Sequence, residues 1–186
     1  MNLYDGPVMF LLRMLMKKGG RASMDPLQVS MTGVRMGERF LQIGCHDKSL
    51  LAGLAAKVGL SGTAVVAAAD DTQARLASSI GRKVGALIEV KDIQEGCAWP
   101  IEDAAFDMVV VDDTDESVSG FDQPVEMLRN SLRALRPGGR IEVVTPVKNA
   151  HPPIDYQKLL SEAGFRPVRI LAETNGLRFV EGLRSH

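Results

Sequence analysis

The stretch ERFLQIGCHDKSL, residues 38–50, combines a short apolar run, a turn at Gly44 and the beginning of an amphipathic segment. It predicts a buried strand over 39–43 and a helix over 49–58 that ends at Gly59. In a doubly wound α/β domain, a nucleotide-type ligand binds at such a strand-to-helix turn. The turn normally contains several glycines, which let the ligand approach the backbone closely. Here Gly44 is followed by His46 and Lys48 at the alternate positions.

Apolar runs alternate with helical patterns through the rest of the chain, as expected for a parallel sheet with crossover helices. The crossover over 93–105 contains Gly96 and Pro100, so we expect a loop there. The Asn175-Gly176 pair predicts a hairpin, which makes the last strand antiparallel to its predecessor. We therefore expect an α/β, Rossmann-like, doubly wound sheet of seven strands, mostly parallel. Further strands are predicted over 63–69, 86–90, 106–111, 140–145, 167–172 and 177–183, and helices over 72–80, 125–135 and 155–163.

Length and composition restrict the domain organisation and the kinds of partner. A chain of 186 residues predicts one domain, with 1–37 as a helical extension and 38–186 as the core. The net charge of −1 provides no basic face for a nucleic acid. Cys45 and Cys97 fit a reducing, cytoplasmic compartment rather than a disulfide framework. No run approaches the roughly 18 apolar residues of a membrane span, so stable membrane insertion is not expected.

The N-terminal extension contains apolar runs at 8–12 and 14–16, with Asp5 before them and Lys17-Lys18 after them. These flanks do not fit a secretory signal. The pattern predicts an amphipathic helix that packs on the domain or on a partner, in a homodimer or with a different protein. A helix over a substrate pocket or on a membrane surface is the alternative.

Five segments, taken together, resemble the motifs of the class I S-adenosylmethionine-dependent methyltransferases. The resemblance covers about residues 36–184, and within the family the chain resembles the small-molecule methyltransferases of the ubiquinone and menaquinone type. It implies S-adenosylmethionine as the cofactor, S-adenosylhomocysteine as the product and a small molecule as the methyl acceptor. In chain order the segments are LQIGC at 41–45, ADDT at 69–72, WP at 99–100 with FDMVV at 106–110, LRALRPGGR at 132–140 and AGF at 163–165.

The resemblance and the strand-end geometry together predict a cofactor site. Ligands of an open parallel sheet bind beyond the carboxyl ends of the strands. Asp70 is expected to accept two hydrogen bonds from a ribose, although it could instead only cap the following helix. Asp92 or Glu95 is expected near an adenine amino group, with the Ile93 amide near the ring. The predicted cofactor-binding residues are Gln42, Gly44, Cys45, His46, Asp70, Asp71, Asp92, Ile93 and Asp112.

Three positions depart from the family's first motif. Gln42 replaces its acid, His46 its second glycine and Lys48 its third. Gln42 can hydrogen-bond an amino group but cannot neutralise a positive charge. His46 places a ring where the ligand approaches, and we expect it to need a backbone conformation that is costly outside glycine. These departures predict weakened or remodelled cofactor binding.

Residues with other chemistry are few. His46, Asp112 and His151 are the candidate bases, should the acceptor need to lose a proton. No metal site is expected, because the adjacent residues Cys45, His46 and Asp47 cannot all turn to one ion. The sequence predicts methyl transfer to a small molecule. The alternative is a catalytically inactive methyltransferase-fold protein that serves as a binding or partner-stabilising subunit.

Overall fold

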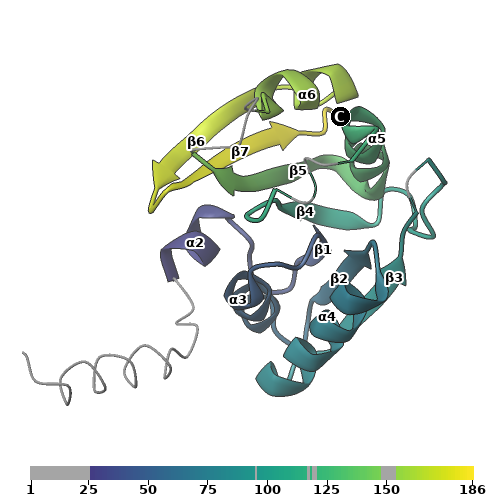
Figure 1. Cartoon of the computed structure of the whole chain (residues 1–186), viewed down its shortest axis with the longest axis vertical. Coiled ribbons are helices and arrows are strands. Elements are labelled where there is room, and N and C mark those ends of the chain that lie inside the picture. Colours follow the sequence, from purple (N-terminus) through teal and green to yellow (C-terminus); the bar gives the residue numbers. More distant parts are fainter. Residues whose placement is uncertain (1–25, 95, 117, 119–120, 148–153) are drawn as a thin grey trace, which may run out of the picture.

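The computed structural model describes residues 26–94, 96–116, 118, 121–147 and 154–186. Its seven-stranded sheet has the order β3-β2-β1-β4-β5-β7-β6 (Figure 1). Strands β1 to β5 pair in parallel, whereas β7 runs antiparallel to both β5 and β6. This confirms the predicted fold class. The predicted N-terminal helix, Glu95 and His151 lie outside the described residues. The strands are β1 (Arg39–Ile43), β2 (Thr63–Ala68), β3 (Ile88–Asp92), β4 (Phe106–Asp112), β5 (Leu135–Pro146), β6 (Val168–Thr174) and β7 (Leu177–Leu183).

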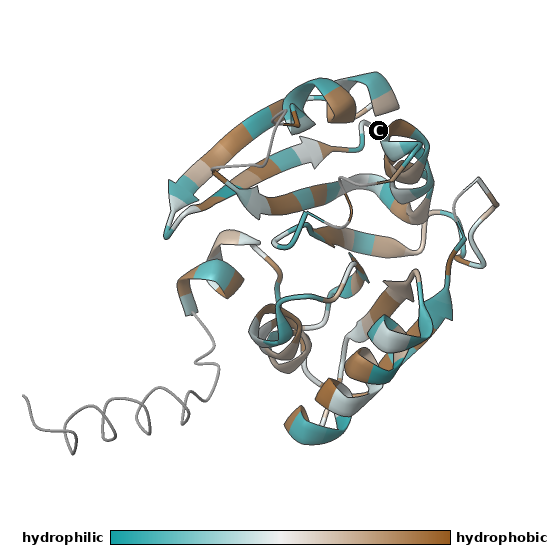
Figure 2. Ribbon diagram, in the orientation of Figure 1, coloured by the Kyte–Doolittle hydropathy of each residue, from teal (hydrophilic) through white to brown (hydrophobic). Residues whose placement is uncertain are grey.

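Helices cover both faces of the sheet, and each layer has its own apolar core. Helices α2 (Pro26–Met31), α3 (Lys48–Val58) and α4 (Asp71–Val84) contribute to the core on one face. Helices α5 (Pro124–Ala134) and α6 (Tyr156–Ala163) contribute to the core on the other. Hydrophobic and hydrophilic residues alternate along α4, which packs one side and exposes the other (Figure 2).

The central strands are largely buried because helices cover both of their faces, and β2 shows this most clearly. Strand β2, with the sequence TAVVAA, is buried at all but its first residue. Ala64 and Val66 join the core of α3 and α4, and Val65 and Ala67 join the core of α5 and α6. Because β1 to β5 are parallel, their carboxyl ends lie at the same edge of the sheet.

The prediction that α4 ends near Gly81 is wrong. The helix continues to Val84, and Gly85 ends it in a left-handed conformation with φ +70°. Gly81 lies inside the helix, and glycine suits this position because a Cβ there would come within 2.9 Å of the Ala86 carbonyl oxygen. A glycine that permits close packing therefore resembles a helix stop in sequence. As a consequence β3 begins at Ile88, two residues later than predicted.

Strand β5 contains a buried acid that the strand pattern did not reveal. Glu142 is 0% exposed, and neither of its carboxyl oxygens has a hydrogen-bond partner among the described residues. Burial, and secondarily the neighbouring charge of Glu181, raises the pKa of Glu142 to about 9. Arg140 and Arg169 act in the opposite direction. The folded chain therefore holds Glu142 as a neutral acid at neutral pH.

Replacing this acid by its neutral isostere should change how stability depends on pH. The folded pKa of about 9 lies above the ordinary value of 4.5. The contribution of Glu142 to the free energy of unfolding is therefore fully present below pH 4.5 and decreases as the pH rises toward 9. Glu142→Gln removes this loss, which amounts to at most about 1.4 kcal/mol per pH unit. We expect the variant to exceed the parent in urea unfolding at pH 8 and to match it near pH 5.

Glu162→Gln, on the exposed side of α6, is the matched control and should leave the pH profile unchanged. An advantage for Glu142→Gln that stays constant across this pH range would contradict a raised pKa.

Candidate functional site

Two adjoining cavities open beyond the carboxyl ends of β1, β2 and β3. The smaller one, which we call the strand-end cavity, has a volume of about 190 Å³ and brings together Gly44, Asp70 and Ile93. The larger one, which we call the tryptophan cavity, has a volume of about 310 Å³. The two share Ala69, Ile93 and Phe121. A single elongated ligand can therefore extend through both.

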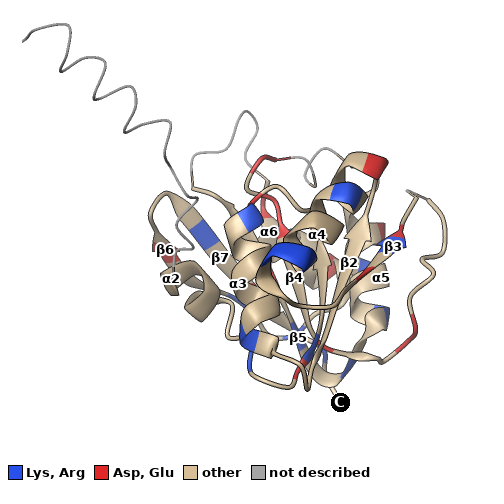
Figure 3. Cartoon of the chain, turned by 90° about the horizontal axis from the view of Figure 1, so that it is seen from below, with Lys and Arg blue, Asp and Glu red and all other residues tan. Residues whose placement is uncertain are grey.

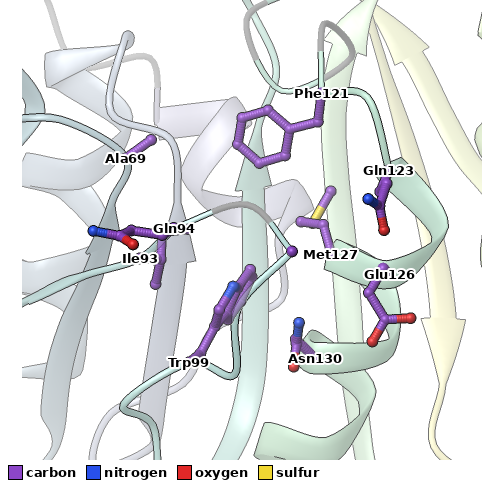
Figure 4. A pocket seen from close by; sticks show the side chains of 10 residues that line it. Ala69, Ile93, Gln94, Trp99, Phe121, Gln123, Glu126, Met127 and Asn130 are labelled. Carbon is purple, nitrogen blue, oxygen red and sulfur yellow. The ribbon is translucent and has the colours of Figure 1, made fainter.

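Apolar and amide side chains line the tryptophan cavity. Trp99 from the loop after β3 and Phe121 from the segment before α5 turn their rings toward the space beside Met127 (Figure 4). Gln94, Gln123, Glu126 and Asn130 supply the polar groups. Among the described residues, neither lysine nor arginine lines this cavity, so the lining suits a flat, uncharged ring with hydrogen-bonding edges.

The sequence reasoning did not find the tryptophan cavity. Trp99 is the single tryptophan of the chain, and it precedes Pro100 in a loop. A large ring in such a loop is the signal that could have pointed to it. Phe121 and the residues of α5 carried no comparable signal, because only the fold brings them opposite Trp99.

The loop after β1 is held by the buried carboxylate of Asp112. Its Oδ2 accepts the backbone N–H groups of His46 at 2.9 Å and Asp47 at 2.8 Å. Its Oδ1 accepts the hydroxyl of Thr114 at 2.6 Å and the Thr114 N–H at 3.3 Å. Burial raises the pKa of Asp112, and the bonds from Thr114 and Asp47 oppose this shift. These contacts make Asp112 a support of the loop; contact with a cofactor, or action as a base, stays a prediction.

Gly44 is the glycine on which this loop depends. Its φ of +78° is in the left-handed region that side chains rarely adopt. A Cβ on Gly44 would also lie 2.5 Å from the Asp112 carbonyl oxygen. Asp47 then begins α3, because its side chain accepts the N–H groups of Ser49 and Leu50.

Gln42 and Cys45 are buried and line neither cavity. The Gln42 Nε2 donates to the Gly44 carbonyl oxygen at 3.1 Å, so this side chain supports the turn. Cys45 packs in the apolar core of α3 and α4. Burial raises the pKa of its thiol to about 12, which keeps it protonated at neutral pH. A direct role of either residue in cofactor binding remains a prediction.

The strain expected at His46 is absent. His46 does not have a positive φ, and its half-exposed ring places Nδ1 3.1 Å from Asp115 Oδ2. Lys48 is exposed in the first turn of α3. Neither side chain lines a described cavity. The expectation of a costly backbone at His46 is therefore wrong, because the loop presents only backbone N–H groups to Asp112 at this point.

Asp70 caps α4 and lies at the strand-end cavity, while its contact with a ribose stays a prediction. Its Oδ1 accepts the N–H groups of Thr72 at 2.7 Å and Gln73 at 2.9 Å, which caps α4. The residue also lines the strand-end cavity. No hydrogen bond to Oδ2 is found within the described part of the chain. Asp71, by contrast, is exposed and lies 3.7 Å from Arg75 in an ion pair.

At the end of β3, Ile93 reaches the cavities with its side chain. Its N–H donates to the Ala68 carbonyl oxygen at 2.9 Å, and the position of this amide near an adenine ring stays a prediction. Ile93 lines both cavities, whereas the exposed Asp92 lines neither. A contact between Asp92 and a cofactor stays a prediction.

Asp113 is a second buried acid that the sequence reasoning left unassigned. Its Oδ2 accepts the Tyr156 hydroxyl at 2.7 Å, and its Oδ1 accepts the Val118 N–H at 3.0 Å. Burial and the neighbouring Asp113 raise the pKa of Tyr156. Because Val118 lines the strand-end cavity, its hydrogen bond to Asp113 helps to fix the wall of that cavity.

Among the residues described, His, Cys, Asp and Glu form no group that could hold a metal ion.

Comparison with known families agrees with this geometry. A family model described as a methyltransferase domain matches residues 41–143. The ubiquinone/menaquinone biosynthesis C-methyltransferase UbiE of Cronobacter sakazakii is 27% identical over 128 residues, or 68% of this chain and 50% of the relative. The protein of the same name from Pasteurella multocida is 29% identical over 117 residues, or 62% of this chain and 42% of the relative. The chain thus spans about half the length of the curated relatives it matches.

Solved structures show the same fold. A S-adenosylmethionine-dependent methyltransferase from Aquifex aeolicus has a TM-score of 0.72 and 19% identity, over 92% of this chain and 97% of the other. The [4+2]-cyclase SpnF has a TM-score of 0.60 and 21% identity, over 78% of this chain and 56% of the other.

Removing the charge that holds the loop should cost stability. Asp112→Asn replaces an acceptor-only carboxylate by a group with one acceptor oxygen and a donor amide. At least one buried N–H then loses its partner, which costs about 1–3 kcal/mol. We expect urea unfolding at pH 7 to show this loss, while the exposed variant Asp71→Asn stays within about 0.5 kcal/mol of the parent. Equal stabilities of the two variants would refute the role given to Asp112.

Proposed function

Because this chain belongs to the class I S-adenosylmethionine-dependent methyltransferase family, we propose that it binds S-adenosylmethionine in the two adjoining cavities and methylates a small molecule. The observation that carries the proposal is the meeting of Gly44, Asp70 and Ile93 around the strand-end cavity. They follow three different strands, and each supplies a different kind of contact: bare backbone, a hydrogen-bond acceptor and an apolar wall.

These residues fit the adenosine part of the cofactor. Asp70 uses Oδ1 for the helix cap, which leaves Oδ2 to accept from ribose hydroxyls. The adenine then extends from the strand-end cavity toward the tryptophan cavity, along Ile93 and Phe121. Trp99 and the amides of Gln94 and Asn130 suit a flat base with polar edges.

The chemistry of methyl transfer is supplied by the cofactor, whose methyl group is already activated. The chain's part is to hold the reactants in line and to keep water out. Asp70 and Glu126 are the acids that line the described cavities, and no described histidine lines them. Of the candidate bases, Asp112 is bonded to the loop and His46 pairs with Asp115. His151, the third candidate base, lies outside the described residues, so the group that takes up a proton from the acceptor stays a prediction.

The acceptor class is proposed from the relatives. Those described above are named ubiquinone/menaquinone biosynthesis C-methyltransferases, so an electron-rich aromatic ring is the acceptor to test first. We further propose that residues 38–186 form a single unit that works in the cytoplasm. No helix in the described part of the chain is long and apolar enough to cross a membrane.

A catalytically inactive binding protein is the second candidate. The observation that favours it is the loop itself, which keeps Gly44 but has Gln42 in place of the family's acid. SpnF, which has the same fold, is named a [4+2]-cyclase, so the fold alone does not determine the reaction. Cofactor binding without methyl transfer would support this candidate.

Titration calorimetry with S-adenosylmethionine and S-adenosylhomocysteine tests the proposed site. We expect saturable binding by the parent and an affinity about tenfold weaker for Asp70→Ser. Serine is a good helix cap, so this variant removes the ribose acceptors while α4 keeps its start. Asp71→Ser, which changes the exposed neighbour, should bind as the parent does. No heat from either ligand at millimolar concentration would refute the proposal.

The same titration decides whether the departures at 46 and 48 obstruct the cofactor. Neither side chain lines a described cavity, so the double variant His46→Gly/Lys48→Gly should keep its dissociation constant within about threefold of the parent value. A gain in affinity of tenfold or more would show that these side chains block the ligand.

A further inference from the structure

Three loops at the end of the sheet opposite the cavities expose large apolar side chains. Met36 is 80% exposed, Leu60 94% and Leu87 91%. These are the highest values among the large hydrophobic residues that the structure describes. Single exposed leucines are ordinary, but three neighbouring loops with the same property require an explanation.

The three loops form one surface, which we call the loop end: residues 33–38, 59–62 and 85–87. The first two are joined by hydrogen bonds from Gly37 N to Val58 O at 3.0 Å and from Thr63 N to Glu38 O at 3.1 Å. The second and third border one hollow of about 230 Å³, which Leu60 and Leu87 both line. Alanine and glycine make up much of the remaining lining.

Positive charge surrounds these apolar tips. Arg35, Lys57, Arg82 and Lys83 are exposed and form no ion pair with a residue that the structure describes. The nearby acids are paired, since Glu38 lies 3.2 Å from Arg140 and Glu89 lies 2.6 Å from Lys91. Residues 48–69 and 72–88 contain no acid at all, although the whole chain has a net charge of −1. Helices α3 and α4 therefore carry basic residues toward this end, whereas α3 has no acidic residue and α4 has none after Asp71 (Figure 3).

Helix stability alone explains only part of this pattern. Lys57, Arg82 and Lys83 lie in the last turns of α3 and α4, where cations favour the negative end of the helix dipole. That effect requires neither Arg35 nor an apolar residue at each loop tip. A second copy of the chain is a poor occupant, because a two-fold contact would bring these unpaired cations together. The complementary surface is anionic and accepts protruding apolar side chains.

We propose that the loop end docks on an anionic lipid surface. Met36, Leu60 and Leu87 enter the interfacial region, and Arg35, Lys57, Arg82 and Lys83 lie against the lipid headgroups. A bilayer suits side chains that protrude from separate loops, whereas an acidic protein would need a matching hollow for each of them. The cavities at the opposite end of the strands then face away from the membrane, so docking is independent of cofactor binding.

Co-sedimentation of the full chain with vesicles tests this docking. The parent should bind vesicles of phosphatidylcholine and phosphatidylglycerol in equal parts, and it should bind pure phosphatidylcholine about tenfold less. Met36→Ser/Leu60→Ser/Leu87→Ser should lower binding to the anionic vesicles about tenfold. Arg35→Gln/Lys57→Gln/Arg82→Gln/Lys83→Gln should lower it as much, and added salt should have little further effect on this variant.

Matched variants keep the test specific. Leu27→Ser/Ile170→Ser/Leu171→Ser removes three other exposed apolar side chains, and Arg75→Gln/Arg129→Gln/Lys158→Gln/Arg166→Gln makes the same change in net charge. Both should bind as the parent does, and unchanged thermal melting confirms that every variant is folded.

All variants retain residues 1–25, so binding through that segment would leave the loop-end variants at the parental level and overturn the proposal. Failure of the parent to bind anionic vesicles would overturn the proposal as well. This holds even if the loop end binds an acidic protein instead.

Discussion

A buried carboxylate at the end of β4 determines the shape of the ligand-binding edge. Asp112 is 0% exposed, and it avoids the cost of a buried charge by accepting four hydrogen bonds, two from the β1 loop and two from Thr114. Three of these donors are backbone N–H groups, two of them in the β1 loop, and any residue except proline supplies such a group. The path of the loop therefore depends on Asp112 and Gly44 and is insensitive to most side chains at position 46, whereas the Asp47 side chain caps α3.

This dependence explains how the loop retains its path with a single glycine. In a glycine-rich turn, the missing side chains allow the unusual backbone and the close approach of the ligand. Here Gly44 alone has a positive φ within the turn, and Asp112 holds the following residues from the other strand. The Gln42 side chain also stabilises the turn by donating a hydrogen bond to the Gly44 carbonyl oxygen. The loop therefore lacks the second and third glycines of the motif, and hydrogen bonds from the loop to Asp112 hold its backbone instead.

The sheet was predictable from the sequence because its determinants are local. Apolar runs such as 63–68 mark strands that are covered on both faces, and the Asn175-Gly176 pair marks the antiparallel hairpin. Gly81 misled the prediction because its purpose, close contact with Ala86, depends on a turn that forms later in the chain. The cavities were predictable only in part. Asp70 and Ile93 follow strand ends, whereas Trp99, Phe121 and Met127 lie together through packing that no local pattern records.

The two ends of the sheet can change separately because each βα unit contributes to both. A crossover helix begins beside the cavities, as α3 does at its Asp47 cap and α4 at its Asp70 cap, and it finishes at the loop end. About 11 to 14 helical residues separate the two ends, which is roughly 16–21 Å along the axis. Charges placed at the last turns are therefore further from the cavities than a Debye length at physiological salt. A cationic, apolar surface at Leu60 and Leu87 leaves the acids that serve the ligand-binding edge undisturbed.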